Sequence, residues 1–450
     1  MGTGDMIKEA LKRAGMVVAA TILLWLTPGM PVRAQDVAFE DVVARLRSQD
    51  SRARLDALKL LKAAGYIDAV MPVMPLIADP SPDVQVQAID TEISLYLVDE
   101  AYTRELTRDL ARGRDMSLAA RALAQGRGAT IGNLAPPAVI GALAAAVGAG
   151  DPRVRQDALD AIGVLGPPLV SRGQFPDPKN TIPRLTAALR DPMPPVRASA
   201  AVVLGRLFDA ALGDPKAGAN LLAVRGDVGE MLVNAMNDAD QDARHASISA
   251  TGYLRYERAI RSLLDFYAYY KRDLLGLASL DALARIGHAS CLGTFAGAYD
   301  VKDDEVRRLA VEGVARVGDR PAVQAILARA ESDTSSLVHL AAAFARAKGG
   351  DYSELTAIVD AVKKPELQAL AFDYLVELGP AVVPSLGVIQ NYRDPKVRAA
   401  LAELLGIIGT PSLLPTVDAL ARDRDRLVSS AAQRSQARLT LRQPGQSRRP

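Results

Sequence analysis

The stretch from Asp303 to Asp319, DDEVRRLAVEGVARVGD, contains the pattern that decides the fold. Its main apolar residues fall on one face of an α-helix, at the spacing that a buried helix requires; they are Val306, Leu309, Ala310, Val314 and Val317. Gly318 follows at the position where the C-terminal cap of a helix favours a left-handed residue. The stretch therefore predicts one amphipathic helix that ends at a glycine.

The same pattern recurs along the chain as an apolar residue followed by a glycine twelve residues later. From Gly287 onward these glycines are 30 or 31 residues apart. A constant period of this length predicts stacked helix–turn–helix units, each of which buries its apolar face against its neighbours. The pairs are Ala53/Gly65, Val154/Gly166, Leu275/Gly287, Val306/Gly318, Leu337/Gly349, Leu367/Gly379 and Val397/Gly409.

Four of these units resemble the HEAT-like repeats that are also seen in phycobilin lyases. The resemblance rests on a turn Asp, a Val-Arg pair, a small or apolar residue and a Gly, and it spans about residues 40–440. It implies an all-α fold, an α-solenoid of about eleven repeats whose Val-Arg helices line the concave side. These helices are expected to start near residues 53, 84, 118, 154, 196, 243, 275, 306, 337, 367, 397 and 427, and residues 100–150 fit the pattern least well.

The first 34 residues have the pattern of a secretory signal peptide. Lys8, Lys12 and Arg13 precede an apolar run of 13 residues, and Val32-Arg33-Ala34 gives a cleavage site. The run is short for a membrane span, which needs about 20 residues. We therefore expect an exported, periplasmic or secreted protein with no integral span after cleavage, a membrane-anchored form being the alternative; Met1 and Met6 are both possible starts.

Charge and cysteine content exclude further classes of partner and of covalent cross-link. The signal peptide holds four basic and two acidic residues, so the remainder has 50 of each, which argues against a nucleic-acid partner. Cys291 is the only cysteine, so no internal disulfide can form. The three domains expected are a signal peptide (1–34), a repeat solenoid (35–440) and a disordered basic tail (441–450).

The recurring aspartates and arginines are interpreted as structural. Asp151/Arg155, Asp303/Arg307 and Asp394/Arg398 are each four residues apart at a helix start, where a charge pair can form on one face. Asp151, Asp191 and Asp394 also precede a proline, which predicts an N-cap followed by a first helical residue. The HEAT-like resemblance adds that such residues, Arg197 included, form a ladder across stacked turns, with a ligand-binding stripe as the alternative.

The stretch Tyr253–Tyr270 holds five of the twelve tyrosines, interleaved with arginines. Tyr and Arg are typical of protein-binding hot spots, so the candidate partner-binding residues are Tyr253, Arg255, Tyr256, Tyr267 and Tyr269. Tyr253 and Tyr256 are expected to project together into the concave groove. The alternative is that Phe266, Tyr267 and Tyr270 fill core space between unequal repeats.

No catalytic or metal-binding pattern stands beside these residues. The three histidines are isolated, with no His-Glu pair and no zinc-ligand spacing. The sequence therefore predicts a non-enzymatic scaffold without cofactor that binds a protein or peptide partner along its concave face. A lyase or isomerase acting on a bound pigment or prosthetic group, and a structural component of the cell envelope, remain the alternatives.

The expected signal peptide, the leader formed by residues 1–34, makes a direct prediction. Cleavage after Ala34 should leave Gln35 as the first residue of the exported protein, which N-terminal sequencing of the extracytoplasmic fraction would show. Recovery of the intact leader in the membrane fraction would instead establish an anchor.

Overall fold

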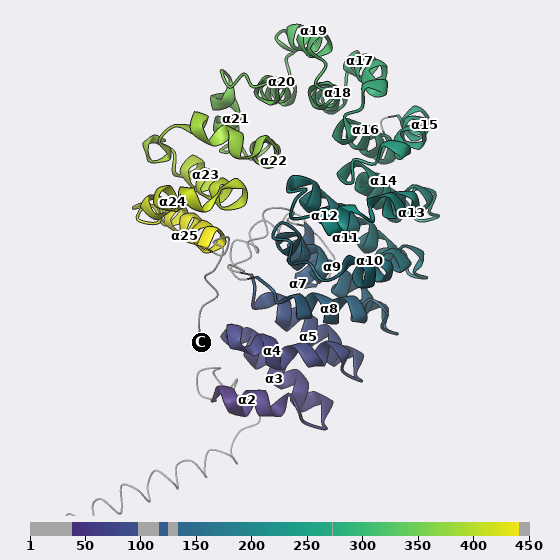
Figure 1. The fold of residues 1–450 in the computed structure, drawn as a ribbon, viewed down its shortest axis with the longest axis vertical. Coiled ribbons are helices and arrows are strands. Elements are labelled where there is room, and N and C mark those ends of the chain that lie inside the picture. The colour runs from purple at the N-terminus through teal and green to yellow at the C-terminus, as the bar shows by residue number, and fades with distance from the viewer. Residues whose placement is uncertain (1–37, 98–116, 125–133, 272, 441–450) are drawn as a thin grey trace, which may run out of the picture.

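The protein forms a coil of paired helices, shown in a computed structural model that describes residues 38–97, 117–124, 134–271 and 273–440 (Figure 1). These ranges contain 23 α-helices, short 3-10 turns and no strand. The expected signal peptide and the expected basic tail lie outside the described residues. The all-α solenoid predicted from the repeat period is thus confirmed.

Eleven helices form the inner row of the coil, and each packs against the inner helix before and after it. Figure 1 shows this row on the concave side, as the resemblance implied. The inner helices are α3 (Ser51–Ala64), α5 (Pro82–Ser94), α9 (Pro152–Val170), α11 (Pro194–Gly213), α14 (Gln241–Tyr253), α16 (Leu274–Ile286), α18 (Asp304–Val317), α20 (Ser336–Lys348), α22 (Gln368–Leu378), α23 (Pro395–Ile408) and α25 (Arg426–Thr440).

The outer row consists of shorter elements, each of which precedes its inner helix in the chain. They are α2 (Phe39–Arg45), η1 (Ile67–Ala69) with α4 (Val70–Val73) and η2 (Met74–Ala78), α8 (Pro137–Ala146), α10 (Pro178–Ala187) with η4 (Ala188–Arg190), α12 (Ala219–Leu222) with α13 (Arg225–Ala235), η5 (Glu257–Ala259) with α15 (Ile260–Tyr270), η6 (Ala289–Cys291) with α17 (Leu292–Tyr299), α19 (Arg320–Ala330), α21 (Leu355–Ala361), η7 (Gly379–Leu386) with η8 (Ile389–Asn391), and η9 (Pro411–Leu413) with α24 (Leu414–Leu420).

One expected repeat helix, near residue 118, is not part of either row. Helix α7 (Leu118–Ala124) packs against α5 and α9, but α5 also contacts α9 directly, and η2 contacts α8. Both rows therefore continue past α7 without it. The apolar run LAARALA has the composition of an inner helix, and only the tertiary packing shows that it is an addition to the eleven repeats.

The expected helix ends are correct for some units and wrong for others. Gly65, Gly287 and Gly318 adopt left-handed conformations at helix C-caps, with φ of 67°, 62° and 73°. Gly166 instead lies inside α9, where a Cβ atom would come within 2.7 Å of the Leu207 side chain. At that position glycine serves close packing between helices rather than termination.

The coil returns on itself near its C-terminal end. Arg172, just after α9, donates a hydrogen bond of 3.3 Å to the backbone carbonyl of Arg438 in α25. In Figure 1 the last helix accordingly lies beside the first third of the chain. The concave face is therefore the inside of a nearly closed turn.

Among the described residues, one segment, Gln368–Leu386, is long and apolar enough to cross a membrane. In this fold it consists of α22 followed by η7, and α22 packs against α21 and α23 within the coil.

Small residues set the spacing of the inner row, and this can be tested. A Cβ atom on Gly252 in α14 would lie 2.6 Å from the backbone Cα of Ala282 in α16. Gly252→Ala should therefore lower the free energy of unfolding by about 1–3 kcal/mol through overpacking, measured by urea denaturation. Gly141→Ala in α8, where a Cβ would meet nothing within 4 Å, should leave the protein as stable or slightly more stable.

Candidate binding surface

Pairs of arginine and aspartate join consecutive repeats along the coil. The guanidinium of Arg155 forms two bonds with Asp191, at 2.7 and 2.8 Å. Its remaining terminal nitrogen donates to the carbonyls of Ala149 and Gly150. Each such arginine thus fixes its own preceding turn and the turn of the next repeat at once. The same arrangement occurs in Arg54–Asp79, Arg197–Asp238, Arg307–Asp333 and Arg398–Asp423.

The expected pairs between residues four apart are not the ones that form. Asp151, Asp303 and Asp394 are N-caps, and each accepts the backbone N–H two residues later. Arg155, Arg307 and Arg398 turn toward the neighbouring repeat because its aspartate offers a bidentate partner in a half-buried turn. Asp191 is one of these partners rather than an N-cap: α11 starts at Pro194 with Met193 as its N-cap.

The aspartates that pair with these arginines share one position relative to the next inner helix. The five pairing aspartates each stand five residues before the first buried residue of the next inner helix, which is a valine in four cases and Ala243 in α14. At α16 that position is Tyr270, and Arg244 accordingly bonds only the carbonyls of Asp238 and Ala239. Its buried Nε atom has no hydrogen-bond partner. The ladder is therefore interrupted between α14 and α16.

Beyond this interruption, aromatic and basic side chains follow the inner face near the C-terminal ends of the helices. We call Tyr253, Arg285, Arg316, Phe344 and Lys348 the inner strip; they come from α14, α16, α18 and α20. The Arg285 guanidinium lies 4.4 Å from the centre of the Tyr253 ring, in a cation–π contact. Its Nε atom is held at 2.7 Å by Asp281, one turn earlier in α16.

Buried carboxylates fix the rest of the strip. Glu312, 2% exposed, accepts hydrogen bonds from Arg308, from the Arg316 guanidinium at 2.9 Å and from the Tyr374 hydroxyl. Glu377 of α22 binds Arg316 at 2.9 Å and Lys348 at 3.1 Å. Burial alone would raise the pKa of Glu377, but the two cations hold it below its usual range. The carboxylate is therefore ionised at neutral pH.

These bonds reach across two repeats. Glu312 and Arg316 lie on α18, while Tyr374 and Glu377 lie on α22, with the alanine-rich helix α20 between them. Phe344 of α20 stacks on the Tyr374 ring, with centroids 4.3 Å apart. The small side chains of α20 permit this approach, so the inner face at α18–α22 is a single rigid network rather than an open trough.

The expected joint projection of Tyr253 and Tyr256 does not occur. Helix α14 ends at Tyr253, and Arg255 then adopts a left-handed backbone with φ of 48°. This turn directs Tyr256, 7% exposed, onto Gly229 of the outer helix α13, where its hydroxyl donates to Glu230 at 2.6 Å. Tyr253 stays half-buried on the inner face, and Arg255 is exposed.

Tyr267 and Tyr269 lie on the outer helix α15. Tyr267 is half-buried and packs against the core together with Phe266 and Tyr270. Tyr269 is 81% exposed and meets the Tyr270 ring edge-on at 4.8 Å. The tyrosine-rich stretch is therefore divided between the inner face, the core and the outer surface.

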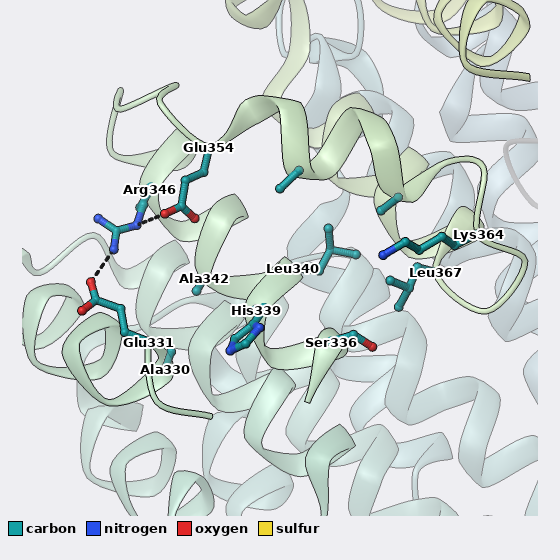
Figure 2. A pocket seen from close by; sticks show the side chains of 12 residues that line it. Ala330, Glu331, Ser336, His339, Leu340, Ala342, Arg346, Glu354, Lys364 and Leu367 are labelled. Atoms are coloured by element: carbon teal, nitrogen blue, oxygen red, sulfur yellow. Dashed lines mark hydrogen bonds and ion pairs between the residues drawn. The ribbon is translucent and has the colours of Figure 1, made fainter. Parts of the chain in front are cut away.

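A hollow of about 390 Å³ opens between α20 and α21 (Figure 2). Arg346 stands at one end, bridging Glu331 at 2.7 Å and Glu354 at 3.4 Å, and Lys364 stands at the other. His339 and apolar residues lie between these ends. No group of three or more His, Cys, Asp or Glu side chains that could hold a metal ion occurs in the described part of the chain.

Comparisons with known proteins find similar chains among solved structures. No family model matches the sequence, and no curated protein matches it. Among solved structures, YibA from E. coli is similar at 15% identity, with 65% of this chain and 100% of that chain covered and a TM-score of 0.31. A designed armadillo repeat protein in complex with the peptide (KR)4 is similar at 13% identity, with 62% and 99% covered and a TM-score of 0.35. An engineered protein covers more of the chain, 91% of it and 99% of its own, at 17% identity and a TM-score of 0.32.

The class of the protein follows from its own helices. Eleven helix–turn–helix units stack in two rows, and arginine–aspartate pairs connect the turns of successive units. These features define an α-solenoid fold whose repeats resemble HEAT repeats.

The ladder predicts a specific dependence of stability on pH. The hydrogen bonds from Arg307 lower the pKa of Asp333 to about 2. Because the folded pKa is below the unfolded value, this pair contributes stability above about pH 4 and loses it as pH falls toward 2. Asp333→Asn should cost about 2 kcal/mol at pH 7 and progressively less at pH 4 and pH 3, measured by urea unfolding.

The exposed pair Arg261–Asp265 on α15, whose side chains are 88% and 68% exposed, supplies the control. Asp265→Asn should change stability little at any of these pH values. An Asp333→Asn cost that does not shrink with acid would contradict the assignment of the pair.

Proposed function

We propose that this protein is an exported scaffold that binds a protein or peptide partner on the concave face of its solenoid. The observation that carries the proposal is the inner strip. It places the partly exposed side chains of Tyr253, Arg285 and Lys348 on the inner helices α14, α16 and α20, where a partner lying along the coil would meet them one after another. The buried side chains of Arg316 and Phe344 support them.

The chemistry of the strip suits protein recognition. Tyr and Arg supply much of the binding energy at protein interfaces because they combine a large apolar area with directional hydrogen bonds. Arg285 and Lys348 keep 29% and 32% of their side chains exposed, so they remain accessible beside their carboxylate partners. The strip thus offers contacts that are both polar and apolar.

The strip is also held in place before any partner arrives. Asp281 orients Arg285 over the Tyr253 ring, and Glu377 orients Lys348 beside Phe344, with the ammonium 6.0 Å from the ring centre. Side chains that are already ordered lose less entropy on binding, which favours affinity. Multipoint recognition by a preformed surface is the mechanism we propose, in place of catalytic turnover.

Export is the second part of the proposal, and it rests on the pattern of residues 1–34. The partner is then expected outside the cytoplasm, and the cleavage experiment given above tests this part separately.

The binding surface is tested by a pair of matched tyrosine variants. Tyr253→Ala removes a ring of the inner strip, and Tyr269→Ala removes the most exposed ring of the outer helix α15. Purified wild type and both variants are immobilised and used to capture proteins from the extracytoplasmic fraction. Tyr253→Ala should weaken capture of the partner by about thirtyfold, the loss typical of a hot-spot tyrosine.

Tyr269→Ala should capture the partner as wild type does, and melting curves of both variants should show folded protein. Loss of capture with Tyr269→Ala and retention with Tyr253→Ala would place binding on the convex surface and overturn the proposal.

A further inference from the structure

Helix α7 occupies the inner face of the coil at the junction of α5, α9 and α11. It packs against α5 and α9, and Figure 1 places it beside α9 on the concave side. Leu118, Ala119 and Leu123 are 2%, 1% and 8% exposed. A seven-residue segment therefore buries its apolar side chains where a partner of the solenoid would lie.

The inner face has a slot for one of these side chains. The Leu123 Cδ1 atom lies 2.5 Å from where a Cβ on Gly163 would stand, and Val203 of α11 borders the same space at 3.0 Å. Only a residue without a side chain leaves this room in α9. Gly163 thus makes a leucine-sized depression between two inner helices.

A hydrogen-bond donor stands at the end of the slot. Arg206 of α11 donates to the backbone carbonyl of Leu123, in the last turn of α7, and also to the carbonyl of Gly163 at 3.5 Å. The last carbonyls of a helix have no partner within the helix, and a cation at this end is favourable. Arg206 therefore recognises the C-terminal end of a helix as such.

The other end of α7 is bound as well. The Ser117 hydroxyl accepts the N–H of Ala120 at 3.1 Å, which caps the helix. Burial raises the pKa of Asp157 to about 6, although the Ser117 hydroxyl bonded to it acts in the opposite direction. Ser117 therefore bonds both its own helix and Asp157 of α9, so the N-terminal end of α7 is also held on the inner face.

Helix α7 needs this face to remain helical, whereas both rows of the solenoid continue past it. Isolated helices shorter than about 12 residues are marginal in water, so seven residues need the inner face to remain helical. Both rows of the solenoid are continuous without α7, because α5 contacts α9 and η2 contacts α8. Helix α7 thus lies on the inner face of the solenoid without belonging to its repeats, as a bound peptide would.

We propose that the inner face of α9 and α11 is a docking site for a helical segment of a protein partner, and that α7 occupies this site in competition with that segment. This inference rests on the proposed scaffold function and specifies its partner. The segment that fits has a leucine for the slot at Gly163, small residues where the helices approach, and a free C-terminal carbonyl for Arg206. Binding of the partner then requires α7 to leave, so the apparent affinity is the intrinsic affinity multiplied by the fraction of molecules in which α7 is undocked.

The test uses the chain itself and a synthetic peptide of residues 115–126, DMSLAARALAQG, carrying a fluorophore. In the opened variant, Leu118→Ser with Leu123→Ser, the chain's own α7 loses its two anchors. Fluorescence anisotropy should show the opened variant binding the peptide at least about tenfold more tightly than wild type, whose site is filled. A peptide with the same two serine changes should not bind the opened variant.

Two further variants control the experiment. Adding Arg206→Ala to the opened variant should weaken peptide binding about tenfold, because the carbonyl loses its donor. Should the opened variant lose its helical circular dichroism, Leu118→Ser alone serves instead, because it removes one anchor of α7 and leaves the docking site intact, and it should bind the peptide more tightly than wild type does. Equal binding by wild type and these variants, or equal binding of the serine peptide, would overturn the inference.

This outcome is independent of the capture experiment, because no cellular partner is involved. Failure of the peptide to bind would remove the docking site at α9 and α11 and leave the inner strip untouched. If Tyr253→Ala leaves capture unchanged, the inner strip is not the binding surface, and the docking site at α9 and α11 is unaffected.

Discussion

Each inner helix of this protein can bury its apolar face only against the inner helices before and after it, and the turns between them must be kept in register for that burial to repeat. The arginine–aspartate pairs meet this requirement at five of the ten junctions between inner helices. Arg155 bonds two carbonyls of its own turn and both carboxylate oxygens of Asp191 in the next repeat. One side chain thus specifies the distance and the orientation between two units. These contacts make the spacing of the inner helices on the concave face regular.

Where the ladder is interrupted, the inner face changes character. Arg244 has no aspartate to bind because Tyr270 stands at the corresponding position. Further along, the helices α18, α20 and α22 are connected by the network around Glu312 and Glu377 on the inner side. Here buried charges on the concave face keep the register together with the ladder pair Arg307–Asp333, and they give the inner strip its fixed geometry. The same bonds that stabilise the bend therefore shape the surface we assign to binding.

The sequence predicted the helices of the repeats well and the side-chain contacts between repeats poorly, for a physical reason. A helix face recurs within a short window, so all eleven inner helices begin within two residues of the expected positions. A contact between repeats joins residues too far apart in the sequence to appear within that window. From the sequence, Arg155 is paired with Asp151, four residues away, whereas its partner Asp191 is 36 residues away. Tyr256 was placed by continuing a helix that the left-handed Arg255 ends. The role of α7 depends on the absence of a side chain at Gly163, which composition alone does not reveal.

The contact between Arg172 and the carbonyl of Arg438 has a consequence for how this chain can evolve. An open solenoid gains or loses repeats at little cost, because each unit touches only its neighbours. Here the end of α25 meets the end of α9, and neighbouring helices are about 8–10 Å apart. Inserting or deleting one unit between them would displace the two ends by about that distance and separate the contact. The circumference of the turn, rather than the stability of any single unit, therefore sets the number of repeats between α9 and α25.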